Sequence, residues 1–227
     1  MLHSSLAGHL PIDKPGRRLH ISSIAATAPV IPVVTIDAVE DAVPLARALL
    51  AGGLRVIEIT LRTPVALYAI EAISKEVPGA IVGAGTLTRV GDFAAAAHAG
   101  AQFCVTPGLT AGLVTAANAV GLPLLPGVMT PSEVIAARNA GFDVLKLFPA
   151  SQAGGIGMLR ALAAPFPDVV FCPTGGITRE AAADYLAQPN VICLGGSWVA
   201  PSGLIANKDW RGIETLAQDA STLSTDR

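Results

Sequence analysis

One pattern of apolar and polar positions repeats along the chain from about residue 30 onward. Each unit of roughly 20 to 27 residues consists of a short apolar run, a turn and an alanine-rich segment. The short runs predict buried strands, and the segments after them have the spacing of helices. Eight strands are predicted, and they begin near Pro32, Leu54, Ala80, Ala101, Leu122, Phe142, Asp168 and Asn190.

The segments between these strands carry apolar residues at helical spacing, as Val43, Ala46, Leu49 and Leu50 illustrate. Several of them end at a glycine suited to the left-handed C′ position that closes a helix. These glycines are Gly52, Gly100, Gly121 and Gly141. We also expect a short helix at about residues 20–28, before the first strand, and a last helix from about Trp210 to Leu223.

Successive strand-then-helix units with strands apolar on both faces indicate parallel strands, and a (β/α)8 barrel is their most economical closure. An open doubly wound sheet is the alternative, but no strand-to-helix turn carries a G-x-G-x-x-G fingerprint with an acidic residue downstream. We therefore predict an α/β protein with a TIM barrel as a single domain over residues 21–227. The two extra helices could each cover an end of the barrel. Residues 1–20 are predicted to be a poorly ordered extension.

Composition and charge narrow the class of protein and of partner. Hydrophobic residues make up 52% of the chain and charged residues 14%, which is typical of a compact, core-rich protein. Apolar stretches are broken well before the roughly 20 residues that a membrane helix needs. A net charge of -2, without a basic run beyond Arg17–Arg18, disfavours nucleic acid and favours a small-molecule ligand.

Cysteines and histidines point away from metal chemistry. The three cysteines lie in separate strand-like runs without metal-ligand spacing, and three of the four histidines lie in the amino-terminal extension. We expect no metal site and no cofactor. The cysteines, Cys104, Cys172 and Cys193, are predicted to be reduced thiols of a cytoplasmic protein, and residues 1–20 lack the pattern of a secretion signal.

Lys146 stands inside an apolar strand-like run, Asp143-Val-Leu-Lys-Leu-Phe-Pro-Ala150. Strand alternation sends it to one face with Val144 and Phe148, while the leucines beside it fill the other face. One interpretation is a lysine whose ammonium extends along the strand to water. The other is a buried amine that attacks a ketone to form a Schiff base. The sequence around Lys146 alone leaves both open.

The second strand ends in Glu58-Ile-Thr-Leu-Arg62, and Glu58, Thr60 and Arg62 share a parity that can face the barrel mouth. A carboxylate and a guanidinium near one ligand supply a proton carrier and a carboxylate clamp. The alternative is a salt bridge between Glu58 and Arg62 that only satisfies two partly buried charges. Thr86, at the end of the third strand, would lie beside a carboxylate that Arg62 binds.

Two Gly-Gly turns follow the seventh and eighth strands, in Thr174-Gly-Gly176 and Gly195-Gly-Ser197. TIM barrels often bind phosphate there, through backbone N–H groups and a helix amino terminus. Each turn alone could be an ordinary tight turn. Two of them at adjacent strand ends, with hydroxyls on Thr174 and Ser197, favour a phosphate site.

These motifs resemble the class I 2-keto-3-deoxy-6-phosphogluconate (KDPG) aldolase and 4-hydroxy-2-oxoglutarate aldolase family. GGLRVIEITLRT, IVGAGT, AQFCVTPG, LPLLPGV, VLKLFPA, FCPTGGI and LGGSW occur in the family's order across residues 30–200. The resemblance implies that Lys146 is the Schiff-base lysine and Glu58 the general acid/base. It assigns the pyruvyl carboxylate to Arg62 and Thr86, and the pocket wall to Pro107, Phe148 and Thr174. It assigns the phosphate to Gly175, Gly176, Gly196 and Ser197.

The resemblance implies cleavage of 2-dehydro-3-deoxy-6-phosphogluconate to pyruvate and glyceraldehyde 3-phosphate, as in the Entner-Doudoroff pathway, by a homotrimer. The galactonate epimer and 4-hydroxy-2-oxoglutarate are alternative substrates. Thr174 is similar to the gluconate-type enzymes, because galactonate relatives tend to have an apolar residue there. A phosphosugar isomerase or epimerase, or a barrel that only binds a ligand, are alternatives from other functional classes. Binding alone does not need a strand-buried amine, which argues against the last of these, and borohydride reduction with pyruvate would separate the aldolase from an isomerase or epimerase.

Overall fold

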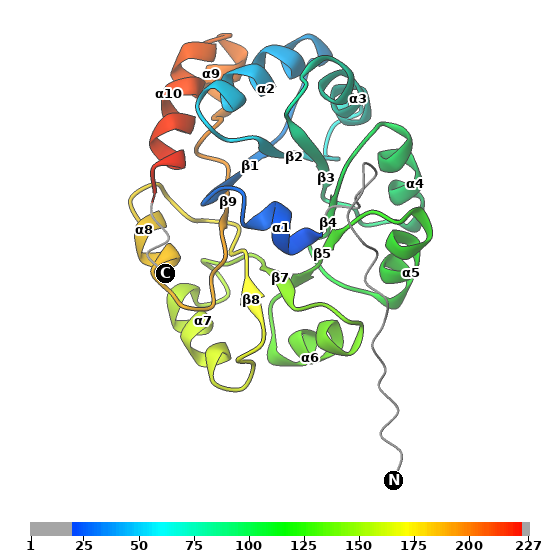
Figure 1. The fold of residues 1–227 in the computed structure, drawn as a ribbon, viewed down its shortest axis with the longest axis vertical. Coiled ribbons are helices and arrows are strands. Elements are labelled where there is room, and N and C mark those ends of the chain that lie inside the picture. The colour runs from blue at the N-terminus through cyan, green and yellow to red at the C-terminus, as the bar shows by residue number, and fades with distance from the viewer. Residues whose placement is uncertain (1–19, 224–227) are drawn as a thin grey trace.

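The computed structural model describes residues 20–223, and its strands form a ring surrounded by helices (Figure 1). The strands are β1 (Val30–Val34), β2 (Val56–Thr60), β3 (Ile81–Gly85), β4 (Cys104–Val105), β5 (Leu124–Leu125), β6 (Gly127–Val128), β7 (Val144–Leu147), β8 (Val170–Phe171) and β9 (Leu194–Gly196). Pro126 separates β5 from β6. Because proline has no N–H to donate, the fifth predicted strand is interrupted there and appears as two segments.

The strands pair in parallel around the ring. One group follows the order β5, β4, β3, β2, β1 and β9, and a second follows β6, β7 and β8. Isolated bridges from Phe171 to Val191 and from Thr174 to Gly195 join the β8 side to the β9 side. The predicted (β/α)8 barrel is therefore confirmed. The domain boundary at residue 20 stays a prediction, since residues 1–19 of the proposed extension lie outside the described residues.

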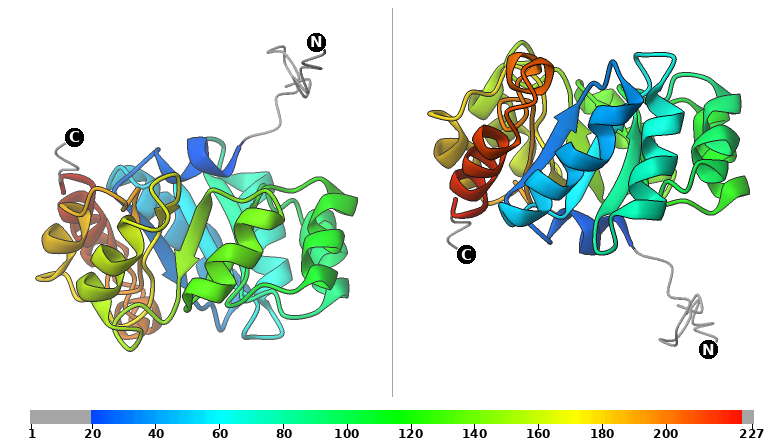
Figure 2. Two further views of the ribbon diagram at one scale, coloured as in Figure 1. Left: turned by 90° about the horizontal axis from the view of Figure 1, so that it is seen from below. Right: turned by 90° about the horizontal axis from the view of Figure 1, so that it is seen from above.

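Helices surround the ring, and α1 covers one end of it (Figures 1 and 2). They are α1 (Ile21–Ala25), α2 (Ala42–Ala51), α3 (Ala66–Glu76), α4 (Val90–His98), α5 (Ala111–Val120), α6 (Pro131–Asn139), α7 (Gly155–Ala163), α8 (Ala182–Leu186), α9 (Ser202–Ala206) and α10 (Trp210–Ser221). The predicted first and last helices correspond to α1 and α10, whereas the short α9 was not predicted. Among residues 20–223, no helix is long and apolar enough to cross a membrane.

The predicted helix-ending glycines are confirmed at three positions and wrong at one. Gly100, Gly121 and Gly141 have φ angles of 88°, 68° and 90°. Gly52 has a φ of -76°, and the left-handed residue is Gly53, with a φ of 93°. A different constraint favours glycine at residue 52, because a Cβ there would lie 2.5 Å from the Cβ of Ala217 on α10. Close packing of α10 on α2, which the local sequence does not show, explains this glycine.

Strand alternation separates the barrel interior from its outer layer. In β7, Leu145 and Leu147 belong to the apolar cluster that includes residues of α6 and α7. Val144 belongs instead to the cluster inside the barrel. Lys146, two residues further on, therefore also faces the interior, as its parity predicted.

Helix α1 closes the amino-terminal end of the barrel. Ile24 and Ala25 of α1 pack in the interior cluster with Val56 and Val144, which are the first residues of β2 and β7. Figure 1 shows α1 within the ring, and Figure 2 shows it at one end of the barrel. A ligand that reaches the interior must therefore enter at the carboxyl ends of the strands.

Candidate active site

The two predicted reactive groups meet inside the barrel. Lys146 on β7 and Glu58 on β2 lie on opposite parts of the ring, and their side chains point inward. Lys146 Nζ donates to Glu58 Oε1 at 3.2 Å, and the two residues are only 5% and 3% exposed. Lys146 thus ends in the barrel interior rather than at the surface. Its buried partner rules out the interpretation of a lysine extended to bulk water.

Small residues make room for this pair. A Cβ on Gly85 would lie 2.2 Å from Glu58 Oε1, so the carboxylate occupies the space that a side chain at residue 85 would fill. Gly127, which pairs with Lys146 in the β6–β7 register, could not carry a Cβ either, because it would lie 2.3 Å from the carbonyl carbon of Pro107. The predicted site residue Pro107 therefore lies next to the strand that flanks Lys146.

Phe148 covers one side of the lysine. Lys146 Nζ lies 5.3 Å from the centroid of the Phe148 ring, within the range of a cation–π contact. Taking two charged groups out of water is costly, and their attraction repays the cost only in good geometry. This close pairing of an amine and a carboxylate is suited to chemistry in which the amine becomes an imine and the carboxylate carries a proton.

Arg62 and Thr86 lie at the ends of the neighbouring strands β2 and β3. The Arg62 N–H donates to the Thr60 carbonyl at 2.8 Å in the turn after β2, and its side chain lines a cavity. No salt bridge joins Arg62 to Glu58 within residues 20–223, which leaves the guanidinium available to a ligand. Thr86 has a φ of 63°, a left-handed conformation that is uncommon for a residue with a side chain and is often found at functional sites.

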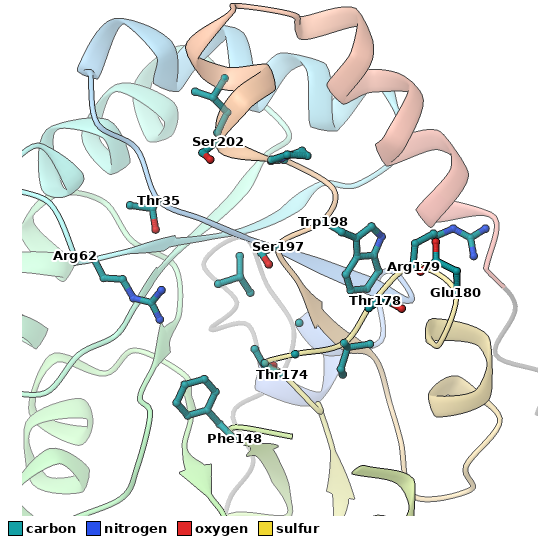
Figure 3. Close-up of a pocket in the computed structure, with 18 residues that line it drawn as sticks. Thr35, Arg62, Phe148, Thr174, Thr178, Arg179, Glu180, Ser197, Trp198 and Ser202 are labelled. Carbon is teal, nitrogen blue, oxygen red and sulfur yellow. The ribbon is translucent and has the colours of Figure 1, made fainter. Parts of the chain in front are cut away.

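A cavity of about 780 Å³ opens at the carboxyl end of the barrel (Figure 3). Six of the predicted site residues line it: Arg62, Phe148, Thr174, Gly175, Gly176 and Ser197. Lys146 and Glu58 are not on its wall. Each has a neighbour on the wall: the Phe148 ring lies 5.3 Å from Lys146 Nζ, and Val33 is the register partner of Glu58. Thr86, Pro107 and Gly196 are not on its wall either.

The two Gly-Gly pairs differ in backbone conformation and in the side chains that they contact. Gly175 and Gly176 have φ angles of 100° and 72°, so the turn after β8 needs glycine at both positions. Gly195 and Gly196 belong to strand β9 itself, so the prediction of a Gly-Gly turn after the eighth strand is wrong for these two residues. Of the two, Gly195 lines the cavity, and a Cβ there would lie 2.2 Å from Thr174 Oγ1. Gly196 instead packs against the ring of Trp198, 2.5 Å from where its Cβ would be.

Several residues of the cavity wall were not predicted from the sequence. They include Val33, Thr35, Gly195, Trp198, Arg179 and Ser202. Val33 and Thr35 share the inward parity of β1, a signal that was present in the sequence. Arg179 forms an ion pair with Asp219 of α10, and this contact holds the pKa of the Asp219 carboxyl below its usual value. In the part of the chain that the structure describes, no group of three or more His, Cys, Asp or Glu could hold a metal ion.

Comparison with known proteins agrees with this geometry. A KHG/KDPG aldolase from Escherichia coli is 48% identical over 198 residues, which cover 87% of this chain and 93% of that protein. A crystal structure of KDPG aldolase from Legionella pneumophila, with pyruvate captured as a covalent carbinolamine intermediate, has a TM-score of 0.88 and 44% identity. That match covers 91% of this chain and all of the other.

A structure of 2-keto-3-deoxy-6-phosphogluconate aldolase from Zymomonas mobilis with 3-phosphoglycerate has a TM-score of 0.86 and 48% identity. That match covers 90% of this chain and 96% of the Zymomonas chain. The family model for KDPG and KHG aldolase matches residues 21–216, which is most of the chain. Together with the relatives above, this match shows that the chain belongs to the KDPG and KHG aldolase family.

Proposed function

We propose that this protein is a class I aldolase that cleaves 2-dehydro-3-deoxy-6-phosphogluconate to pyruvate and glyceraldehyde 3-phosphate. The observation that carries the proposal is the buried contact of 3.2 Å between Lys146 Nζ and Glu58 Oε1. The carbinolamine of pyruvate in the Legionella relative supports an amine that adds to a C2 ketone.

In the proposed reaction, the Lys146 amine adds to the C2 ketone and loses water to give a protonated imine. Glu58 takes the proton of the C4 hydroxyl, the C3–C4 bond breaks, and its electron pair moves through C3 into the imine. Glyceraldehyde 3-phosphate leaves. Glu58 returns a proton to C3 of the enamine, and water then hydrolyses the imine to release pyruvate and free Lys146.

The wall residues are proposed to hold the two anionic ends of the substrate. Arg62 would bind the carboxylate through its guanidinium, with Thr86 beside it. The phosphate is assigned to Gly175 and Gly176 after β8 and to Gly196 and Ser197 at the end of β9, and its binding energy would position C4 over the reactive pair. Pro107, Phe148 and Thr174 are assigned to the wall between these ends.

Three finer properties stay predictions: the range of substrates, the oligomeric state and the location in the cell. 4-Hydroxy-2-oxoglutarate is a second candidate substrate, because the Escherichia coli relative is named KHG/KDPG aldolase. The galactonate epimer remains an alternative, against which Thr174 is the available argument. The homotrimer and the cytoplasmic location are likewise proposals. A turnover assay with all three substrates under the same conditions would rank them.

The function is tested by trapping the imine. Wild-type protein treated with pyruvate and borohydride should gain a reduced pyruvyl adduct, which peptide mass spectrometry should place on Lys146. Lys146→Ala should abolish the adduct. Lys75→Ala is the matched control, because Lys75 is exposed and pairs with its helix neighbour Glu71. An adduct on another lysine of the wild-type protein would overturn the assignment.

A further inference from the structure

Thr35 is a polar residue of the cavity wall to which the proposed reaction gives no role. It follows β1 directly, and Val33 and Thr35 both line the cavity. Val33 is the register partner of Glu58. Thr35 is therefore one inward position, about 6 to 7 Å, nearer the barrel mouth than the level of Glu58.

The hydrogen bonds around Thr35 fix what its hydroxyl can do. Thr60 Oγ1 donates to the Val34 carbonyl oxygen at 3.1 Å, and the oxygens of Thr35 and Thr60 are 2.9 Å apart. A hydroxyl has one proton, and a carbonyl oxygen can only accept. Both contacts are satisfied when Thr60 donates to Val34 and Thr35 donates to Thr60. The Thr35 oxygen then presents only lone pairs to the cavity.

An oxygen that presents lone pairs accepts from a donor and repels an anion. The carboxylate and the phosphate of a keto-acid phosphate are acceptors, so Thr35 is unsuited to either end of the ligand. Figure 3 shows Thr35 and Arg62 on one side of the cavity, with Thr174 and Ser197 on the other. With the carboxylate on Arg62 and the phosphate at Ser197, the middle of the ligand would lie between these groups. There the donors are hydroxyls.

We propose that Thr35 is a specificity-determining residue, which accepts a hydrogen bond from the substrate hydroxyl on C5, next to the phosphorylated carbon. This inference rests on the proposed aldolase function. The C4 hydroxyl is committed to Glu58, because it loses its proton when the C3–C4 bond breaks. The C5 hydroxyl is the remaining donor. It lies further from Lys146 along the substrate, as Thr35 lies nearer the mouth than Glu58.

The test is the reverse reaction, in which pyruvate adds to an aldehyde. Glyceraldehyde 3-phosphate carries the hydroxyl that becomes the one on C5, whereas 3-oxopropyl phosphate keeps the aldehyde and the phosphate but lacks it. The wild-type protein should prefer glyceraldehyde 3-phosphate in kcat/KM. Thr35→Val keeps the shape and removes the acceptor, and it should lower kcat/KM for glyceraldehyde 3-phosphate by about 2- to 13-fold, the range of a neutral hydrogen bond. The value for 3-oxopropyl phosphate should change less than about twofold on the same grounds.

Two further variants separate recognition from folding. Thr35→Ser keeps the hydroxyl and should retain the preference for glyceraldehyde 3-phosphate. Thr63→Val removes a similar hydroxyl, which donates to the Ile36 carbonyl at 2.6 Å and is not on the cavity wall, and it should leave the preference unchanged.

The outcomes distinguish this inference from the function beneath it. If the wild-type protein joins pyruvate to neither aldehyde and traps no pyruvate, the aldolase proposal fails. If it traps pyruvate but uses the two aldehydes equally, or if Thr35→Val slows both equally, the role of Thr35 is overturned while the aldolase stands. Loss of the preference in Thr35→Ser as well as in Thr35→Val would mean that shape, rather than the acceptor, decides.

Discussion

Gly85 offers a way to move the Glu58 carboxylate without changing Glu58 itself. The residue lies at the end of β3, and its φ is not in the left-handed region, so alanine is compatible with the backbone there. The added Cβ of Gly85→Ala would lie 2.2 Å from Oε1, 2.6 Å from Cγ and 2.7 Å from Cδ of Glu58. Carbon atoms in contact prefer a separation of about 3.5 to 4.0 Å. The carboxylate must therefore retreat by about 1 Å or more.

The expected loss follows from that displacement. A shift of about 1 Å in a catalytic group can cost on the order of 100-fold in rate, which corresponds to about 2.7 kcal/mol. Overpacking also destabilises a fold by roughly 1 to 3 kcal/mol. We expect Gly85→Ala to slow the exchange of pyruvate methyl protons by about 100-fold, because this step needs Glu58 at C3 of the enamine. Borohydride trapping at Lys146 should persist, because imine formation needs the amine.

The assay is proton NMR of pyruvate in deuterated buffer, with thermal unfolding measured on the same samples. Gly83→Ala is the matched control. It lies on the same strand, but its Cβ would strike the Phe103 ring at 2.4 Å rather than Glu58. It should lower the unfolding temperature and spare exchange in the folded protein. Gly91→Ala, with nothing within 4 Å of the added Cβ, should leave the exchange rate unchanged.

The reasoning fails if Gly85→Ala exchanges pyruvate protons at close to the wild-type rate while folded. The position of the Glu58 carboxylate beside Gly85 would then be irrelevant to proton transfer, and another base would have to be sought. Equal slowing in Gly85→Ala and Gly83→Ala would also refute it, because the effect would then come from disturbed packing of β3.

Three other predictions concern stability and assembly. Thr130 caps α6 by accepting a hydrogen bond from the Glu133 N–H at 3.3 Å. Thr130→Ala should therefore lower the free energy of unfolding, measured by urea titration, by about 1 kcal/mol. Thr115→Ala, on an exposed helix face, is the control. Burial raises the pKa of the Cys104 thiol to about 12 from 9.0. The stability that the protonated thiol contributes is therefore complete below pH 9 and is lost as the pH rises toward 12, by up to about 1.4 kcal/mol per pH unit. The difference in unfolding free energy between wild type and Cys104→Ala should shrink over that range. A difference that stays constant would contradict the assignment. The predicted homotrimer should have about three times the mass of the 23.0 kDa chain in light scattering, and a monomeric mass would refute it.

Most of the strands and helices could be predicted from the sequence, because the periods of strands and helices are local properties. The direction of Lys146 followed from alternation within one strand, and the buried neighbours on either side of it agree. The partner of Lys146, in contrast, could not be predicted from local sequence. Glu58 lies 88 residues away, and local spacing suggested Arg62 as an ion-pair partner instead. Only closure of the ring brings β2 and β7 to face each other, so the pairing could not follow from either motif alone.

The roles of neighbouring glycines also could not be predicted from local sequence. The sequence offers Gly52 and Gly53 side by side; Gly53 takes the left-handed conformation, and the approach of Ala217 on α10 leaves no room for a Cβ at residue 52. Gly195 and Gly196 are also adjacent in one motif. The hydroxyl of Thr174, across an isolated bridge, makes Gly195 the cavity residue, and the Trp198 ring occupies the space beside Gly196. In both pairs, contacts between distant segments decide which glycine does what.

Hydrogen-bond polarity gives the cavity a pattern that the list of residue types could not reveal. Thr174 Oγ1 donates to the Cys172 carbonyl at 3.3 Å, and Thr35 donates to Thr60, so both hydroxyls present lone pairs to the ligand. Arg62, at the end assigned to the carboxylate, can only donate. A wall with acceptors in the middle and a cationic donor at one end suits a chain of hydroxylated carbons with an anionic terminus. It disfavours a ligand that is anionic along its whole length, because the threonine oxygens would then face other acceptors without a proton between them.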